Sequence, residues 1–260
     1  MSASLWLDHL IIAVHDLAQA VVAYRALGFT VIPGGRHANQ ATENALICFR
    51  DGSYIELLAR TGEPPLPGMI DFSRSMGASE GLAGFALGTV DIDAAAAALG
   101  ERGVACGEIV SGQRQRTDGI HIVWKLALIE DGFAPFLIQD VTPHNLRVPD
   151  APAITTHDNG AVRLRAIEMT SRAPARAAQR LEAILGKPSL SNADDSYVIR
   201  MDSFAIDIRP ASTERPDETI ADSALCGAII ESELHTPSHT DCGLAHGLRF
   251  TFQHSQGLST

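Results

Sequence analysis

The sequence of 260 residues has no long hydrophobic run and no excess of positive charge. Its apolar opening is short and interrupted by Asp8 and His9, and no basic segment precedes it, which predicts a strand rather than a signal peptide or a membrane span. Twenty basic and 31 acidic residues give a net charge of -11, which opposes binding to phosphate backbones or anionic lipid. We therefore expect neither a nucleic-acid nor a membrane partner.

Paired cysteines and the common catalytic motifs are also missing. The four cysteines lie far apart without a CxxC pair, so we expect reduced thiols and a cytoplasmic location. The chain contains no P-loop, no GxGxxG, no GxSxG and no HExxH. Those absences argue against the usual nucleotide-binding, hydrolase and zincin classes.

An internal repeat organises the first half of the chain. The segments LDHLIIAVHDL (residues 7–17) and LAGFALGTVDI (82–92) align without gaps, and each precedes an alanine-rich stretch that ends in a glycine. Asp16 and Asp91 stand where a helix N-cap accepts free backbone amides, and Gly28 and Gly103 stand where a left-handed C-cap is favourable. Each copy therefore begins as strand, turn and helix.

Three strand-like runs follow each predicted helix, which gives a βαβββ unit at about residues 6–60 and again at about 81–142. We predict an α+β fold in which the paired units form a cup-shaped mixed sheet with its concave face open to a ligand. Residues 61–81, rich in Pro, Gly and Ser, are predicted to be a linker with one short helix around 69–76. Residues 160–260 again run strand, helix, strand, strand and are interpreted as an incomplete, shortened third module.

The segments LDHLIIAV, FTVIPGGRH, TENALI and YIELL together resemble the glyoxalase-like branch of the vicinal-oxygen-chelate superfamily, which includes glyoxalases, bleomycin-resistance proteins and dioxygenases. RTDGIHIVWKL and PFLIQD in the second copy are similar to that branch too. The resemblance implies a glyoxalase-like domain over residues 1–145 and a small-molecule ligand in its cup. Members of the superfamily include metal-dependent enzymes and drug-sequestering proteins, so the fold alone does not select a chemistry.

The resemblance further implies a divalent metal held by one residue from the first strand and one from the fourth strand of each unit. Strand alternation places His9 and Glu56 on the concave side. The aligned positions in the second copy are Gly84 and Gln139, so His9, Glu56 and Gln139 are the predicted ligands for Zn, Ni, Mn or Fe. The alternative is a metal-free hydrogen bond between His9 and Glu56. His144 is either a replacement ligand or a surface residue.

Two arginines are candidates for binding an anionic substrate group. Arg36 and His37 follow a glycine pair at a strand end, where both side chains can reach the mouth of the cup. Arg114 aligns with Arg36, so the two guanidinium groups either clamp a carboxylate from opposite sides or remain solvated.

Further candidates lie on the third and fourth strands. Asn44 and Trp124 occupy the third strands of the two units, and Trp124 either lines the pocket or packs in the core. Tyr54 is either a proton donor near Glu56 or a core residue. Near the C-terminus, His235, His239, Cys242 and His246 have metal-ligand chemistry at short spacing, but Pro237 and Gly243 oppose a helix there, and we interpret the segment as a polar loop.

Three functions remain open on these residues. In the first, a metal on His9 and Glu56 polarises two neighbouring oxygens of a substrate, Glu56 accepts the acidified proton, and a lyase or isomerase reaction results. In the second, the metal-free cup sequesters an aromatic or acidic metabolite. The third is an extradiol-type dioxygenase, which needs two His and one Glu on iron. The third module is expected to pack on the cup or to mediate self-association, as in a homodimer.

Overall fold

The computed structural model describes residues 4–66, 80–116, 118–129, 135–211, 223–233, 241–246 and 248–254. Most of the predicted linker, its expected helix around 69–76, and His235 and His239 lie outside these residues. Within the described part of the chain, no helix has both the length and the apolar character that crossing a membrane requires.

The first two βαβββ units form as the repeat predicts, and the fold class is confirmed. The first unit contains β1 (Trp6–Val14), α1 (Leu17–Ala26), β2 (Ile32–Arg36), β3 (Thr42–Cys48) and β4 (Tyr54–Arg60). The second contains β5 (Gly81–Gly88), α2 (Ile92–Glu101), β6 (Val110–Gln115), β7 (His121–Leu128) and β8 (Pro135–Asp140).

The predicted caps explain where both long helices of these units begin and end. Asp16 accepts a hydrogen bond from the Gln19 amide at 3.0 Å, and Asp91 accepts one from the Ala94 amide at 3.0 Å. Gly28 and Gly103 follow the helices with φ of 84° and 75°, a conformation that other residues adopt only with strain.

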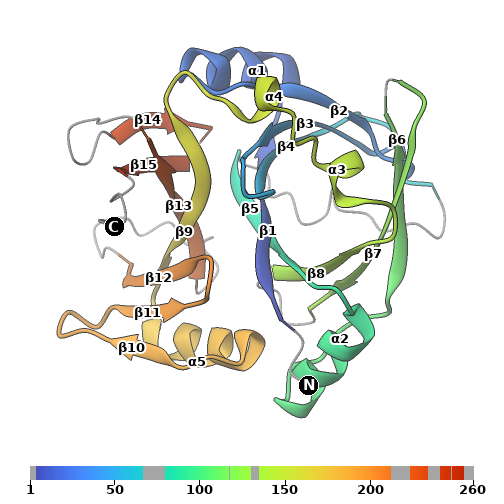
Figure 1. Cartoon of the computed structure of the whole chain (residues 1–260). Coiled ribbons are helices and arrows are strands. Elements are labelled where there is room, and N and C mark those ends of the chain that lie inside the picture. Colours follow the sequence, from blue (N-terminus) through green and yellow to red (C-terminus); the bar gives the residue numbers. More distant parts are fainter. Residues whose placement is uncertain are drawn as a thin grey trace, which may run out of the picture.

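The two units share one eight-stranded mixed sheet with the order β2-β3-β4-β1-β5-β8-β7-β6. β1 and β5 pair antiparallel at its centre, whereas β4 and β8 run parallel to β1 and β5. The sheet curls until its edges meet at an isolated bridge between His37 and Arg114. Figure 1 shows the resulting barrel, with α1 and α2 on its outside and α3 (His144–Arg147) across one end.

The third segment repeats the same order of elements after the short helix α4 (Pro152–Thr155). It contains β9 (Ala161–Ser171), α5 (Pro174–Leu185), the short strands β10 (Ser189–Ser191) and β11 (Tyr197–Arg200), and β12 (Ala205–Pro210). Three further strands follow, β13 (Ser223–Ser232), β14 (Asp241–Ala245) and β15 (Leu248–His254). Together they form a seven-stranded sheet in the order β10-β11-β12-β9-β13-β15-β14.

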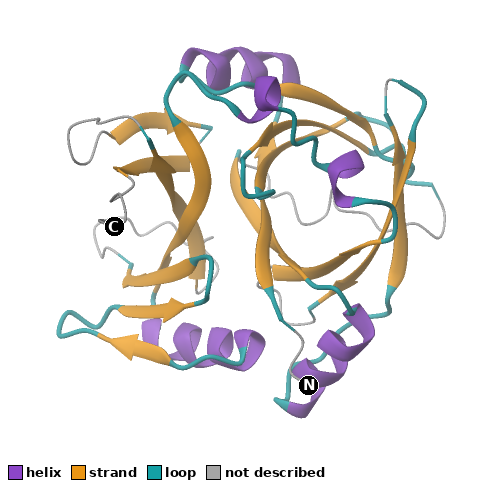
Figure 2. Ribbon diagram, in the orientation of Figure 1, coloured by secondary structure: helices purple, strands orange, loops and turns teal. Residues whose placement is uncertain are grey.

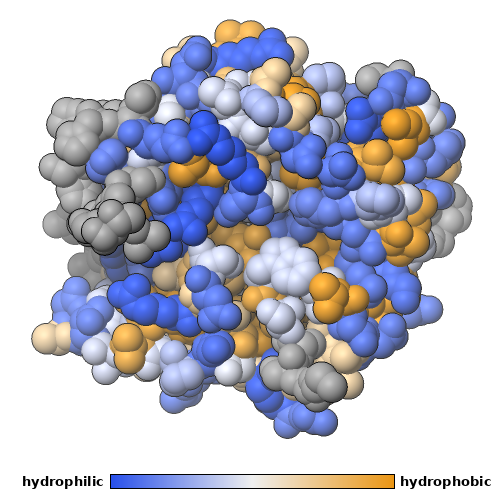
Figure 3. All heavy atoms as spheres, viewed as in Figure 1, coloured by the Kyte–Doolittle hydropathy of each residue, from blue (hydrophilic) through white to orange (hydrophobic). Residues whose placement is uncertain are grey.

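The two sheets pack against each other through one hydrophobic core (Figure 2). The buried cluster joins Leu10 and Ile12 of the barrel to Ile167 and Phe250 of the second sheet. Tyr24 of α1 contributes at this junction, with its ring 5.8 Å from the ring of Phe250. On the face shown in Figure 3 the surface is mostly hydrophilic, and apolar atoms show between the two halves. The division into a domain at 1–145 and a module at 160–260 stays a prediction.

We expect the shared core to make the two sheets unfold together. Ile167→Ala removes a fully buried side chain of β9 and should lower the free energy of unfolding by about 2–5 kcal/mol. Both tryptophans, Trp6 and Trp124, belong to the barrel. Denaturant unfolding followed by tryptophan fluorescence therefore reports whether the substitution destabilises the barrel. Leu190→Ala, at an exposed position of β10, is the control. An unchanged fluorescence midpoint in Ile167→Ala would show that the sheets unfold independently.

Candidate active site

A cavity of about 480 Å³, including its open mouth, lies inside the barrel. Side chains from both units line it, namely His9, Ile11, His37, Asn44, Leu46, Tyr54, Glu56, Leu58, Arg114, Trp124, Phe136, Ile138 and Arg147. The predicted residues His9, His37, Asn44, Tyr54, Glu56, Arg114 and Trp124 are therefore brought together, whereas Arg36 and Gln139 are not.

A β-bulge in β1 places two consecutive polar residues inside the barrel. Leu7 pairs with Leu87 and His9 with Ala86, so Asp8 is an extra residue with no partner on β5. The bulge interrupts strand alternation, so Leu7 packs in the core with Leu10 although it lies two positions before His9. Asp8 and His9 are both buried, and the Asp8 carboxylate lies 2.6 Å from His9 Nδ1.

Glu56 lies between two imidazoles on the cavity wall. Its Oε2 is 3.5 Å from His9 Nε2, and its Oε1 is 3.6 Å from His37 Nε2. Asn44 donates a hydrogen bond of 2.5 Å to Oε1. His9 and Glu56 do lie together on the concave side, where strand alternation places them, and their catalytic role stays a prediction.

The environment shifts the pKa values of these three groups in different directions. Burial alone would raise the pKa of Glu56, but the hydrogen bond from His9 and the charge of His37 lower that pKa to about 2. Burial opposes the charged form of His9, yet Asp8 and Glu56 together raise the pKa of His9 above 6.5. For His37, burial and the charges of Arg114 and His9 lower the pKa despite Glu56. An ionised carboxylate therefore lies between an imidazole whose pKa is raised and one whose pKa is lowered.

Arg147, at the end of α3, is a cavity residue that the sequence did not reveal. Its Nη2 lies 2.8 Å from Asp8 Oδ2, and its Nε lies 2.5 Å from Asp140 Oδ1. It also donates to the Tyr54 hydroxyl at 2.9 Å. This one side chain therefore connects α3 to β1, β4 and β8, with only 3% of its surface exposed.

Arg114 enters the cavity, but its predicted partner Arg36 does not. Arg36 is exposed and points to Glu43 at 4.0 Å, because β2 contains a register shift between Pro33 and Gly35 just before it. The predicted clamp of Arg36 and Arg114 is therefore wrong, and Arg147 is the second guanidinium in the cavity. Arg114 donates to the backbone carbonyls of Gly34 and Arg147.

Gln139 lies outside the cavity, so its prediction as a ligand is wrong. Ala86 pairs with Phe136 in the second unit as Ile11 pairs with Glu56 in the first. The structural equivalent of Glu56 is therefore Phe136, and Gln139 follows it by an odd number of positions, on the opposite face of β8. The Gln139 side chain accepts from the Ile92 amide and donates to the Val90 carbonyl, both at 2.9 Å.

The aromatic side chains shape the cavity around the polar cluster. The Tyr54 ring stacks on the His9 ring at 4.4 Å, and Phe136 meets His9 edge-on at 5.7 Å. Trp124 lies above Gly112, where a Cβ atom would come within 2.2 Å of the indole. Trp124 therefore lines the cavity because only glycine leaves room for its indole there.

The four positions at which the resemblance implies metal ligands do not form a fitting ligand set in this chain. They carry His9, Glu56, Gly84 and Phe136, and a glycine and an aryl ring offer no ligand atom. His37 supplies another nitrogen, but Glu56 Oε1, which it faces, already accepts from Asn44.

A different group has ligand atoms within 4.8 Å of one another, namely Asp8, Asp140 and His144. The guanidinium of Arg147 already contacts both carboxylates, and His144 binds Asp140 at 2.7 Å and the Gly52 carbonyl at 3.1 Å. The positive charge that a metal would supply is therefore present in the side chains themselves.

Breaking the buried ion pair should be costly. Arg147→Met leaves Asp8 buried without its guanidinium, and we expect the free energy of unfolding to fall by about 3–5 kcal/mol. Arg50→Met breaks an exposed pair with Glu233 and should cost less than about 1 kcal/mol. Chemical denaturation of both variants measures the difference, and equal losses would contradict the structural role of Arg147.

The two cavity histidines should titrate in opposite directions. NMR titration, assigned with His9→Gln and His37→Gln, should give His9 a pKa above 6.5 and His37 a pKa below 6.5. Because folding raises the pKa of His9, its stabilising contribution is complete below the unfolded value and disappears as the pH rises through the folded value. Asp8→Asn should lower the pKa of His9. Identical titration of the two rings would contradict the assigned contacts.

Comparison with known proteins agrees with this architecture. A model of the glyoxalase-like domain family matches residues 7–185, and no curated protein sequence matches the chain. A hypothetical protein from Staphylococcus aureus has a similar structure, with a TM-score of 0.79 and 17% identity over 96% of this chain and 99% of that one.

A second similar structure is a mutant of 4-hydroxymandelate synthase from Streptomyces coelicolor. Its TM-score is 0.56 at 13% identity, over 89% of this chain and 71% of that one. At these identities the likeness concerns the fold alone. The family match covers most of the chain and includes both units that surround the cavity, and the chain therefore belongs to the glyoxalase-like domain family.

Proposed function

We propose that this chain is an enzyme that moves a proton on a small substrate with neighbouring oxygen atoms, in an isomerase or lyase reaction. The observation that carries the proposal is the position of Glu56, an ionised carboxylate buried in a small-molecule cavity between two imidazoles whose pKa values shift in opposite directions. Titratable pairs separated in this way provide an acid and a base at the same pH.

The base side of the reaction involves Glu56 and His37. Glu56 Oε1 or Oε2 accepts the proton from the carbon next to a carbonyl, and the electron pair of that C–H bond moves into the enolate. His37, with Nε2 3.6 Å from Oε1 and a lowered pKa, is placed to receive the proton from Glu56 in its neutral form.

The acid side involves His9. Its Nδ1 is held by Asp8 at 2.6 Å, which fixes the ring and directs Nε2 into the cavity. The protonated imidazole can donate to the oxygen that becomes negative in the enolate. The product then depends on which carbon or oxygen receives a proton. No step of this proposal uses a metal, because Gly84 and Phe136 offer no ligand atom at two of the four family positions.

Exchange of substrate hydrogen for deuterium tests this proposal directly. In D₂O, proton NMR should show loss of the α-hydrogen signal of a small α-hydroxycarbonyl compound or 2-oxo acid in the presence of the protein. Glu56→Gln should reduce the exchange rate by about 10²- to 10⁴-fold, whereas Glu43→Gln, on the exposed side of β3, should leave it unchanged. Undiminished exchange in Glu56→Gln would refute the assignment.

The pH profile and a chelator add a second check. The exchange rate should be bell-shaped, because it falls when His37 becomes protonated at low pH and when His9 loses its proton at high pH. Treatment with a chelator should leave the rate unchanged. Loss of exchange on chelation, with recovery on adding a divalent metal, would instead support the metal-assisted mechanism.

Sequestration of a small metabolite is the second candidate function. It is favoured by the apolar part of the lining, which includes Leu46, Leu58, Phe136 and Ile138. In that case the protein should bind a small molecule in the cavity while Glu56→Gln leaves the affinity unchanged and no exchange occurs with any compound.

A further inference from the structure

The cavity contains one cation that has no acidic partner among the described residues. Three carboxylates lie in or beside the cavity, and each lies close to an arginine or a histidine. Asp8 pairs with Arg147 at 2.8 Å, and Asp140 pairs with His144 at 2.7 Å. Glu56 faces His9 at 3.5 Å. Arg114 is the remaining cation.

Arg114 is also buried, with only 5% of its surface exposed. Its two hydrogen bonds go to the backbone carbonyls of Gly34 and Arg147, which orient the guanidinium without neutralising its charge. A guanidinium has five N–H donors, so donors remain beyond these two bonds. A buried charge without an opposite charge lowers the stability of the fold unless a bound anion balances it.

We infer that Arg114 binds the carboxylate of the substrate, so that the cavity selects small monocarboxylic acids with an apolar body. This inference rests on the proposed function in so far as it takes the barrel cavity as the substrate site. The planar fork of an arginine matches the two oxygens of a carboxylate, which allows a bidentate hydrogen-bonded pair.

The position of Arg114 in the barrel supports this role. Its backbone bridges to that of His37 where the two edges of the sheet meet, so the anion site and the proton-accepting imidazole come from neighbouring residues. The Tyr54 hydroxyl, which accepts from Arg147, keeps its own hydrogen for donation, because burial raises the pKa of the phenol. Because Arg114 and Glu56 line the same cavity, a carboxylate held by Arg114 lies in the cavity that contains Glu56.

The charge balance favours a carboxylate over a phosphate. A carboxylate carries one negative charge, which matches the single positive charge of Arg114. A phosphate monoester carries about 1.5 to 2 negative charges at neutral pH, and the surplus would be repelled by Asp8 and Glu56. Apolar side chains, including Ile11, Trp124 and Ile138, make up the remaining wall and fit a short aliphatic or aromatic group.

Matched pairs of acids and amides test the inference without any substitution. Titration calorimetry and tryptophan fluorescence would compare lactate with lactamide, butyrate with butyramide, and benzoate with benzamide. We expect at least one acid to bind about tenfold or more tightly than its amide, since each charge-assisted contact in a buried site changes affinity by at least that factor. Equal binding of all pairs, no acid binding up to roughly 10 mM, or tighter binding of inorganic phosphate would overturn the inference.

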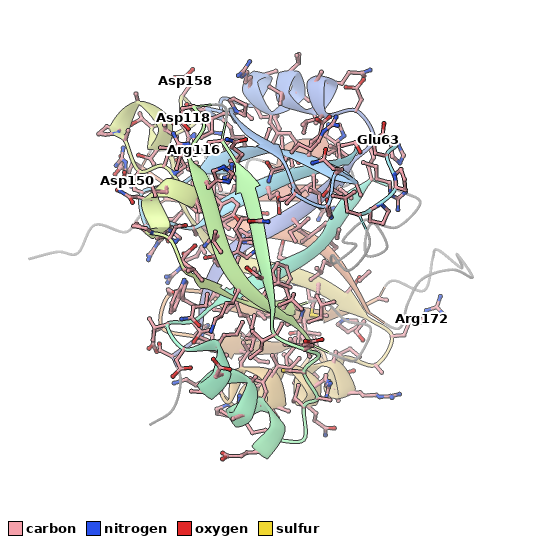
Figure 4. The ribbon with its side chains drawn as sticks, turned by 90° about the vertical axis from the view of Figure 1, so that its right-hand side faces the viewer. Glu63, Arg116, Asp118, Asp150, Asp158 and Arg172 are labelled. Atoms are coloured by element: carbon pink, nitrogen blue, oxygen red, sulfur yellow. The ribbon has the colours of Figure 1, made fainter. Side chains whose placement is uncertain are left out.

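Two variants assign the preference to one residue. Arg114→Gln should abolish the discrimination between acid and amide, while Arg116→Gln should retain it. Arg116 is two residues further along the chain and half-buried, where it donates to the Leu146 carbonyl at 3.2 Å and pairs with Asp118 at 2.8 Å (Figure 4). Circular dichroism and thermal unfolding would verify that both variants fold. Retained discrimination in folded Arg114→Gln contradicts the assignment.

Binding and turnover separate this inference from the proposed function. If acids bind through Arg114 but no compound exchanges its hydrogen, the carboxylate site stands and the enzymatic proposal fails. If neutral carbonyl compounds exchange as fast as acids and Arg114→Gln has no effect on exchange, the enzymatic proposal stands and the carboxylate site fails.

Discussion

The buried ion pair between Asp8 and Arg147 is the interaction on which the rest of the site depends. It joins residues 139 positions apart in the chain and attaches α3 to the central strand of the barrel. The same carboxylate holds His9 Nδ1, so the pair that closes the barrel end also fixes the imidazole beside Glu56. An ion pair this deeply buried loses hydration, and several hydrogen bonds must compensate for that loss. Tyr54 and Asp140 supply them.

The two units of the barrel have similar backbones and different tasks. The first supplies His9, His37 and Glu56, whereas the second has Gly84 and Phe136 at the positions that correspond to His9 and Glu56. The second unit instead contributes Arg114 and Trp124, which hold charge and shape the wall. The two repeated units therefore surround one cavity whose two sides are chemically distinct.

The sequence predicted those parts of the structure that depend on local periodicity. The repeat and its caps predicted both units, and strand alternation placed His9 and Glu56 correctly. The prediction of Gln139 as a ligand failed because the register of β8 against β5 is set by tertiary pairing. The prediction that Arg36 reaches the cavity failed because β2 shifts register just before this residue. Asp8 and Arg147 had no local signal, since one lies in a bulge and the other in a one-turn helix, and only the folded chain brings them together.

The hydrophobic core that the two sheets share also affects how the chain folds during synthesis. Until β9 and β13 have left the ribosome, the barrel presents Leu10, Ile12 and Phe85 on its convex side without their final cover. An exposed apolar face of that kind promotes aggregation of incomplete chains. The C-terminal sheet therefore covers an apolar face of the barrel. A chain terminated before this sheet would keep its cavity residues, but its exposed apolar face would promote aggregation.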